Sequence, residues 1–498
     1  MFARKNRTPT HAAAMAAGAS ALAAGPRALP ARASALAAWA LALGLAGLAG
    51  CSSKSPVAEP EPIEPGVVLV VGNRIEWTTS GAARASVRYG FGAPTGVPPR
   101  FSFDHMAYPD ARERGDRVFR TEHSVALLDL EPGRTIYYQA VSEAPGSVAV
   151  YSPPDSFVAT IGPPQALLTS TMIHIGFGDS HLITMPTTGK RILIDSGYRD
   201  AENSVDTYLQ QHGVTALDAM LATHVHEDHL GGIVGSRGSD ADGMIAAYPP
   251  PVFFDSPLKS GDSLGKPAYQ ELLRSVGPST QRLALERGDS SQNRIDLAFD
   301  PEVVVLCLNS GTPPGYVPVG YEGTNINNES IVIRFSYGDV DFVIGGDAEN
   351  ACESSMLQGW SPATLEVEYF KATHHGLSDA NSASWVNTLK PRVAFIPNTR
   401  LVWDPPEEFE GAIASTVSKL QGIGAHIYVI DEARSMDKAR GTRQYNVSFV
   451  TDGLSYEVRL ELAQQSVPSM TAQSFACVLH ALGAHDEVTA AGGAGWHP

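Results

Sequence analysis

The sequence predicts a layered α/β domain of about 300 residues, preceded by a small all-β domain and an export leader. Three observations lead to this prediction. Strand-like and helix-like segments alternate between residues 166 and 462, which favours an α/β domain. Residues 67–161 contain short alternating apolar segments separated by turns, a pattern typical of a β-sandwich. The first fifty residues combine a basic start with an apolar run. A chain of 498 residues has room for two or three such domains.

The leader ends in a short apolar run. Sixteen small or apolar residues follow Arg32, and at 1.5 Å per residue they span about 24 Å as a helix, short of the roughly 20 residues that cross a membrane. Leu48-Ala49-Gly50-Cys51 resembles the lipobox of bacterial lipoproteins. The resemblance implies that residues 1–50 are a signal peptide, that Cys51 is acylated, and that Ser52 directs sorting to the outer rather than the plasma membrane. A plain signal peptide and an uncleaved anchor stay open as alternatives.

The charge and cysteine content narrow the function. The chain carries −17, and its first fifty residues contribute five bases and no acid, so the remainder carries −22. An acidic surface repels phosphate backbones, so nucleic acid enters only as a candidate substrate and not as a tightly held partner. If Cys51 is lipidated, Cys307, Cys352 and Cys477 remain, and these can form one disulfide at most. The chain is therefore not a disulfide scaffold.

Two regions precede the α/β domain. Residues 51–66 are rich in Pro, Ser and Glu, which favours an extended linker. In residues 67–161, the stretch from Leu130 to Tyr137 reads L-x-P-G-x-x-Y and resembles the tyrosine corner of fibronectin type III-like domains. The resemblance implies a fibronectin III-like sandwich with Trp77 in its core. No catalytic constellation is evident there, which favours a spacer or a substrate-presenting module.

The α/β domain is expected to span residues 166–462. Strands are predicted at 171–177, 180–185 and 190–196, and a helix capped by Ser204 and closed by Gly213 follows them. The apolar segment 217–223 is predicted to be a buried strand that leads into a His-rich loop. Residues 463–498 are rich in Ala, Gly and Ser and are interpreted as a tail.

The His-rich loop carries the clearest chemical signal. It reads His224-Val225-His226-Glu227-Asp228-His229. Imidazole and carboxylate are preferred ligands of zinc and similar divalent ions. Three His and one Asp within six residues could serve two ions, with His224 and His226 on one and Asp228 and His229 on the other.

This H-x-H-x-D-H sequence resembles the signature of the metallo-β-lactamase fold, and further motifs occur in the order of that family. The resemblance implies an αββα sandwich. It also implies that Asp195 in ILIDSG hydrogen-bonds to the His loop without binding metal, and that Asp347 in VIGGD bridges two ions. The implied metal ligands are His224, His226, Asp228, His229, Asp347 and His375.

One branch of the superfamily fits best. Ile175-Gly176-Phe177-Gly178-Asp179-Ser180, Asn328-Glu329-Ser330 and Thr373-His374-His375-Gly376 resemble the hydrolase domain of DNA-internalisation competence proteins and related secreted phosphodiesterases. Asp179 and Ser180 are expected near the His loop, without an assigned role. Lys371 is interpreted as a surface lysine at a strand end.

One departure concerns the first ion. No histidine occurs between His229 and His374, an interval in which zinc β-lactamases, glyoxalase-type thioesterases and lactonases normally have another ligand. The first ion would rest on His224, His226, Asp347 and water, or on an unexpected group. Cys307 lies where the ligand is missing and is interpreted mainly as a core thiol, with metal contact as the alternative, and Asn328 is a similar stand-in.

The sequence therefore predicts an exported, lipid-anchored metallo-hydrolase that uses a metal-bound hydroxide, most readily on phosphodiester bonds of a small molecule or a polymer. Two divalent ions are expected, zinc or alternatively manganese. Asp228 would orient the hydroxide, and His374 would contact the substrate or protonate the leaving group. The alternatives are a lactonase, thioesterase or β-lactamase of the same fold and a non-catalytic, metal-containing surface adhesin.

Overall fold

The computed structural model describes residues 63–160, 162, 165–235, 243–255, 265–285, 301–307, 326–398, 407–430 and 444–463. The predicted signal peptide, the lipidation site Cys51 and nearly all of the linker lie outside the described residues, as does the tail from residue 464. Within the described part of the chain, none of the helices combines the length and the apolar character needed to cross a membrane.

The N-terminal part of the described chain is built from strands around a long central one, β2 (Arg74–Gly90). The first half of β2 pairs with β1 and β4, and its second half pairs with β3 and β5. This one strand therefore connects two sets of neighbouring strands. The remaining elements of this part are β1 (Leu69–Val71), β3 (His105–Tyr108), η1 (Arg112–Arg117), β4 (Arg120–Ala126), β5 (Thr135–Glu143), β6 (Val150–Tyr151) and β7 (Asp155–Val158).

The core of this N-terminal part contains Trp77, as predicted, together with Ile75, Val87 and Ile136. Tyr137, the residue matched to the corner tyrosine, is only partly buried, whereas its neighbour Tyr138 lies in the core.

The rest of the described chain forms two sheets. The first runs in the order β13-β12-β11-β10-β9-β8-β20-β21 and continues through β3 into the N-terminal strands, and the second runs β14-β15-β16-β17-β18-β19. The strands of the first sheet are β8 (Leu168–Met172), β9 (His181–Thr184), β10 (Arg191–Ile194), β11 (Ala219–Leu221), β12 (Val252–Asp255), β13 (Gln281–Ala284), β20 (Tyr445–Thr451) and β21 (Tyr456–Leu462). Those of the second are β14 (Glu302–Cys307), β15 (Val332–Tyr337), β16 (Val340–Gly345), β17 (Tyr369–Lys371), β18 (Val393–Ile396) and β19 (His426–Val429).

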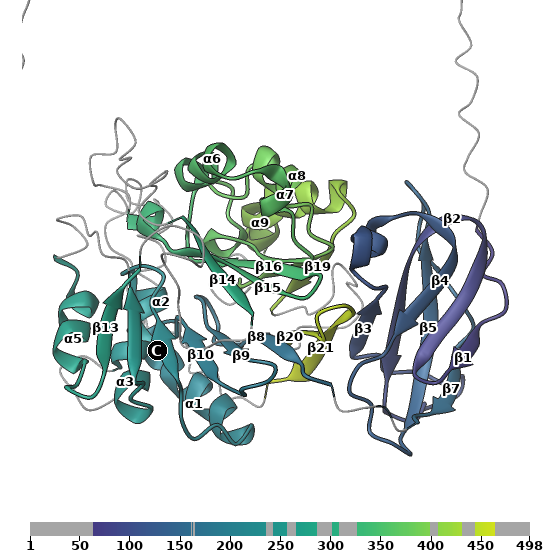
Figure 1. Ribbon diagram of the computed structural model, residues 1–498, viewed down its shortest axis with the longest axis horizontal. Coiled ribbons are helices and arrows are strands. Elements are labelled where there is room, and N and C mark those ends of the chain that lie inside the picture. Colours follow the sequence, from purple (N-terminus) through teal and green to yellow (C-terminus); the bar gives the residue numbers. More distant parts are fainter. Residues whose placement is uncertain are drawn as a thin grey trace, which may run out of the picture. The chain divides into compact units, whose positions relative to one another are not determined.

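Helices cover the outer face of each sheet (Figure 1). The first sheet is covered by η2 (Arg199–Ala201), α1 (Glu202–Gln211), α2 (Glu227–Val234), α3 (Met244–Ala247) and α5 (Pro267–Ser275). The second is covered by α6 (Asn350–Gly359), α7 (Pro362–Leu365), α8 (Ala383–Leu389) and α9 (Glu407–Gly422), with the short helices η3 (Ile326–Glu329) and η4 (His374–Gly376) at strand ends. The layers are thus helix, sheet, sheet, helix, and the predicted α/β sandwich is confirmed.

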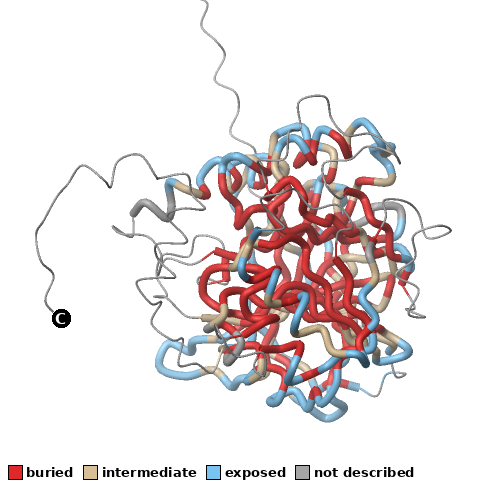
Figure 2. The backbone as a smooth tube through the Cα atoms, turned by 90° about the vertical axis from the view of Figure 1, so that its left-hand side faces the viewer, coloured by how far each residue is buried: buried red, intermediate tan, exposed pale blue. Residues whose placement is uncertain are grey.

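Three apolar layers hold this sandwich together. The side chains between the two sheets include Ile192, Ile333, Phe342 and Phe449, and separate clusters lie between each sheet and its helices. Strands buried on both faces are mostly apolar, as the fully buried β16 shows, in which Asp341 is the one charged residue and pairs with Arg334. The buried backbone in Figure 2 follows these layers.

Two local predictions need correction. The strand expected at 171–177 ends at Met172, and the following residues instead form a loop that carries Asp179. The first helix begins at Glu202, so Ser204 lies inside its first turn and is not its cap. The predicted end of this helix is confirmed, because Gly213 adopts a φ of 63° directly after it.

The N-terminal strands join the first sheet through β3, which pairs with β21. Buried polar groups accompany this junction. Arg392 donates to Glu143 at 2.8 Å, His426 Nε2 lies 2.6 Å from the other oxygen of Glu143, and Tyr89 donates to Glu457 at 2.9 Å. The charged side chains at this junction of β3 and β21 are thus paired with one another or with a tyrosine.

Candidate metal centre

The candidate site forms where four strands end. Asp195 follows β10, the His-rich loop follows β11, Asp347 follows β16, and His374 and His375 follow β17. β10 is parallel to β11, and β16 is parallel to β17. Because the carboxyl ends of parallel strands meet at one edge of a sheet, the loops that carry these residues gather at one end of the sandwich.

We call Asp228, His229, Asp347 and His375 the inner group. His229 Nε2 lies 3.1 Å from Asp347 Oδ1 and 3.9 Å from Asp228 Oδ2. His375 Nε2 lies 3.1 Å from Asp228 Oδ2 and 3.5 Å from Asp347 Oδ1. All four side chains are nearly or fully buried. His229, Asp347 and His375, together with Asp179, offer possible ligand atoms that all lie within 4.8 Å of one another. Asp228 Oδ2 adds a further carboxylate oxygen beside the two Nε2 atoms. Imidazole nitrogens and carboxylate oxygens are ligands that zinc accepts.

We call His224 and His226 the histidine pair. His224 Nε2 lies 3.1 Å from His226 Nδ1 and 3.7 Å from Asp347 Oδ2, and ligand atoms of these three residues all lie within 4.8 Å of one another. Asp347 therefore turns Oδ1 toward the inner group and Oδ2 toward the histidine pair. A carboxylate placed in this way can bridge two ions.

His374 and His375 lie in different surroundings although they are adjacent in the chain. Both have a φ near 50°, in the left-handed region, but their side chains have different partners. His374 Nδ1 lies 2.8 Å from Asp379 Oδ1, and its Nε2 lies 3.8 Å from Asp347 Oδ2 and 3.3 Å from Asn327 Nδ2. His374 thus faces Asp347 without belonging to the inner group or to the histidine pair.

Asp195 lies behind the ligands. Its carboxylate accepts hydrogen bonds from the Thr223 N–H at 2.8 Å and the Thr223 hydroxyl at 2.6 Å, and Oδ2 lies 2.8 Å from His229 Nδ1. A carboxylate on Nδ1 directs Nε2 of the same ring toward a metal and fixes the orientation of the ring.

Asp179 and Lys371 belong to the same site, and the sequence analysis assigned a role to neither of them. Lys371 is fully buried, so its interpretation as a surface lysine is wrong. Its ammonium group forms an ion pair with Asp179 Oδ2 and donates to the carbonyl oxygens of Gly345 at 2.8 Å and Gly346 at 3.2 Å. Asp179 Oδ1 lies 3.2 Å from His375 Nδ1. In the sequence, only the Gly-Phe-Gly-Asp motif pointed to Asp179, and the motif does not indicate that Lys371 is the partner of this carboxylate.

Gly178 explains how that loop approaches the His loop. Its φ is 117°, and a Cβ at this position would meet the carbonyl oxygen of Asp228. The next residue, Asp179, donates its N–H to that same oxygen at 3.2 Å. The loop can lie directly against the His loop because a residue without a side chain precedes Asp179.

The two stand-ins considered for the missing ligand lie elsewhere. Cys307 is fully buried in the apolar cluster beneath α6 and α8, as its core interpretation predicted. The Asn328 side chain binds the backbone N–H groups of Glu349 and Cys352 and the carboxylate of Glu349. Cys307 belongs to none of the groups of His, Cys, Asp and Glu that could hold a metal ion among the residues that the structure describes.

The donor atoms of the inner group fit a metal ion. His229 Nε2 and Asp347 Oδ1 are buried, and neither makes a hydrogen bond within the described part of the chain. Buried polar atoms without a hydrogen bond are costly, and a cation between them would satisfy both. Divalent metal binding is the chemistry that this donor set suggests.

The imidazoles differ in their affinity for protons. Burial lowers the pKa of His224 well below its ordinary value and that of His226 to about 4. Burial alone would also lower the pKa of His229 and His375, but neighbouring carboxylates, with Asp347 foremost, raise it well above the ordinary value. The histidine pair is therefore neutral at neutral pH, whereas the inner group holds protons in the metal-free protein.

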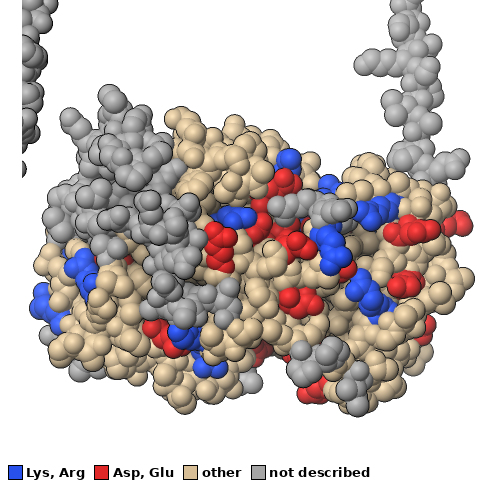
Figure 3. All heavy atoms as spheres, in the orientation of Figure 1, with Lys and Arg blue, Asp and Glu red and all other residues tan. Residues whose placement is uncertain are grey.

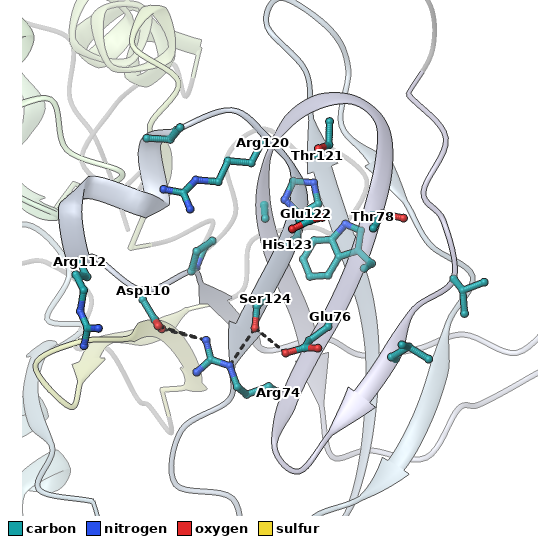
Figure 4. A pocket seen from close by; sticks show the side chains of 16 residues that line it. Arg74, Glu76, Thr78, Asp110, Arg112, Arg120, Thr121, Glu122, His123 and Ser124 are labelled. Carbon is teal, nitrogen blue, oxygen red and sulfur yellow. Dashed lines mark hydrogen bonds and ion pairs between the residues drawn. The ribbon is translucent and has the colours of Figure 1, made fainter.

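A second hollow, of about 950 Å³, lies on the N-terminal strands (Figure 4). Arg74 crosses it, lying 3.3 Å from both oxygens of Asp110 and donating to Ser124 at 3.0 Å. The hollow contains both acids and bases, and none of its residues belongs to a group of potential metal ligands in the described chain. Among the described residues, the groups of potential metal ligands lie at the strand ends of the α/β sandwich.

Comparisons with known proteins give a partial match. No family model matches the chain. ComE operon protein 3 of Bacillus subtilis (strain 168) is 24% identical over 246 residues, which cover 45% of this chain and 27% of that protein. The chain thus spans about a quarter of the length of the relative that it matches.

Among solved structures, a metallo-β-lactamase of Cronobacter sakazakii with a HARLDQ motif matches 51% of this chain and 92% of its own, with 12% identity and a TM-score of 0.26. Purple acid phosphatase PPD1 from yellow lupin (Lupinus luteus) seeds matches 66% of this chain and 57% of its own, with 13% identity and a TM-score of 0.17. The observed layers and the His/Asp groups at the strand ends are those of an α/β sandwich with a plausible divalent metal site.

Proposed function

We propose that this protein is a metal-dependent hydrolase that binds two divalent ions, zinc before manganese, and cleaves phosphodiester bonds. The observation that carries the proposal is the position of Asp347, whose two carboxylate oxygens face two separate groups of imidazoles. Two ions held about 3.5–4 Å apart lower the pKa of a water molecule and neutralise the charge of an ester oxygen.

The chain's own residues divide the remaining work. His229 and His375 present Nε2 to one ion, and Asp195 and Asp179 contact the Nδ1 atoms of these two rings. Asp228, at the start of α2, lies 3.1 Å from His375 Nε2 and is placed to orient the attacking water. The histidine pair holds the other ion.

His374 is proposed to contact the substrate. Asp379 fixes its Nδ1, so the ring presents Nε2 toward Asp347 without occupying a ligand position in either group. From there it can hold an oxygen of the ester or donate a proton to the leaving group.

A phosphodiester is proposed as the substrate because its anionic oxygen suits a pair of divalent ions, and because the chain's motifs resemble those of phosphodiesterases. The surface argues against a grip on a long polyanion. On the face in Figure 3, Lys and Arg lie scattered among Asp and Glu, and the described atoms form no broad basic patch there. Together with the net charge of −17, this favours a small phosphodiester or the exposed end of a polymer as the substrate.

The setting proposed for this activity is the bacterial cell envelope. Export and a lipid anchor at Cys51, leading to the outer membrane, are supported only by the pattern of residues 1–52. Globomycin sensitivity and labelling with a palmitate analogue test this directly, and an unlabelled protein that stays in the cytoplasm would contradict it.

The experiment for the activity combines metal analysis with a substrate panel. Bis-p-nitrophenyl phosphate, nitrocefin and a lactone are offered to the wild type, to His226→Ala and to Asp347→Ala, with His212→Ala as a control at an exposed histidine. We expect cleavage of the phosphodiester alone, loss of activity in both site variants, loss of one ion in His226→Ala and loss of both ions in Asp347→Ala.

Other outcomes separate the alternatives. Faster cleavage of nitrocefin or the lactone would replace the phosphodiesterase by another hydrolase of this fold. Full metal content without turnover of any ester would favour the adhesin. Unchanged metal content in both site variants would contradict the proposed site.

A further inference from the structure

A buried cation lies directly behind the inner group. The Lys371 side chain is fully buried, and its ammonium group forms an ion pair with Asp179, which is also buried. A buried charge without a partner is costly, and even a paired one seldom stabilises a fold more than apolar residues of the same volume would. The pair therefore calls for an explanation beyond stability.

The contacts of Lys371 reach the ligands on two sides. Its two backbone acceptors, Gly345 and Gly346, immediately precede Asp347. Its carboxylate partner, Asp179, lies 3.2 Å from His375 Nδ1 and 3.8 Å from His229 Nδ1. One ammonium group thus touches the backbone that sets Asp347 and the carboxylate that lies behind both imidazoles.

Asp179 lies within 4.8 Å of possible ligand atoms of His229, Asp347 and His375, but the ring atoms that it approaches place it to orient the imidazoles. It faces the Nδ1 atoms, whereas Asp228 and Asp347 face the Nε2 atoms of the same two rings. Its backbone is also fixed, because its N–H donates to the Asp228 carbonyl and its own carbonyl accepts from Gly197 at 2.9 Å.

We propose that Asp179 and Lys371 act together as positioning residues that set the geometry, and hence the metal affinity, of the inner group and not of the histidine pair. This inference rests on the proposed two-ion function. Residues that orient metal ligands from behind typically change metal affinity by about 10- to 100-fold when they are replaced. Asp179→Asn, Lys371→Arg and the charge-free double variant Asp179→Asn/Lys371→Met test it.

The measurement is a titration of the metal-free protein with Co²⁺, followed by its visible absorption and by equilibrium dialysis. His375→Ala identifies the signal of the inner group. We expect Asp179→Asn and the double variant to bind Co²⁺ at the inner group about 10- to 100-fold more weakly, with a changed absorption band, while the histidine pair keeps its affinity. Lys371→Arg retains the positive charge, so this variant should keep most of the Co²⁺ affinity that the wild type has at the inner group.

The double variant Glu143→Gln/Arg392→Met is the control, because it neutralises another ion pair, between a buried arginine and a partly buried glutamate that contact none of the metal ligands named above. It should leave both affinities unchanged. Equal weakening of both ions, unchanged affinity in variants that unfold cooperatively in urea, or failure of all the pair variants to fold would overturn the positioning role. A wild type that binds no Co²⁺ would instead contradict the proposed function itself.

Discussion

The inner group and the histidine pair share Asp347 but differ in what surrounds them. The inner group is buried, and Asp195 and the Asp179–Lys371 ion pair lie behind its imidazoles. In the histidine pair, His226 is partly exposed, and the described residues add no third imidazole within reach of both members. The comparison shows that two groups of ligand-type side chains that share one loop can differ in completeness. If each group holds an ion, as proposed, we expect the inner group to bind its ion more tightly.

The largest effect is expected from replacing the shared carboxylate. Asp347→Ala should weaken both ions by more than the roughly 100-fold that marks the upper range for residues behind the ligands. Metal content and phosphodiesterase activity measure this, with Asp339→Ala at a half-exposed position as the control. Loss of only one ion would show that Asp347 serves a single group, and would contradict its proposed role as a carboxylate shared by the inner group and the histidine pair.

Separate removal of one imidazole from each group should separate the two ions. His375→Ala is expected to abolish the tighter ion, and His226→Ala the weaker one, while each variant retains the other ion. Sequential Co²⁺ binding followed by calorimetry distinguishes the two losses. If both variants lost the same ion, the division into two groups would be wrong.

A smaller effect is expected from Asp195→Asn. The variant keeps the shape of the side chain but places an amide beside groups that donate to a carboxylate, so His229 loses its fixed orientation. We expect about a 10- to 100-fold loss of affinity at the inner group. The histidine pair should lose less, because it contacts Asp195 only through Thr223. Equal losses at both sites would show that Asp195 serves the whole loop.

The smallest effect concerns pH. His229 and His375 have raised pKa values and must release protons when an ion binds, so the inner group's affinity should rise with pH by up to about tenfold per unit for each proton released. His224 and His226 have lowered pKa values and are already neutral, so the pair's affinity should stay nearly flat above about pH 5. Co²⁺ titrations between about pH 5.5 and 7.5, with an indicator dye for released protons, compare the two slopes. Identical slopes would contradict the difference in protonation.

Much of the candidate site could be predicted from local sequence. The His-rich loop, Asp195, Asp347 and His375 each follow an apolar strand segment, and a polar residue at a strand end is visible without a structure. The roles of His374 and His375 were harder to separate, because adjacent residues share the same local pattern. Both residues share a left-handed backbone, and it is their separate partners, Asp379 for His374 and Asp179 for His375, that distinguish them.

Lys371 shows where local sequence fails. A lysine at the end of a three-residue strand is ordinarily exposed, and the acids near it in the sequence, Glu366 and Glu368, pair with Arg117 instead. Its partner Asp179 lies 192 positions away and reaches it only because the two sheets pack face to face. The tail and leader predictions concern residues outside the described ranges and stay predictions.

The sequence by itself determined the alternation of strands and helices and the ligand-type side chains at strand ends, because burial periodicity and residue chemistry are local properties. The tertiary structure alone decided which oxygen of Asp347 faces which imidazoles, and that a buried lysine stands behind them. Those relations depend on strand order and on the packing of the two sheets, and they join atoms that are distant in the chain.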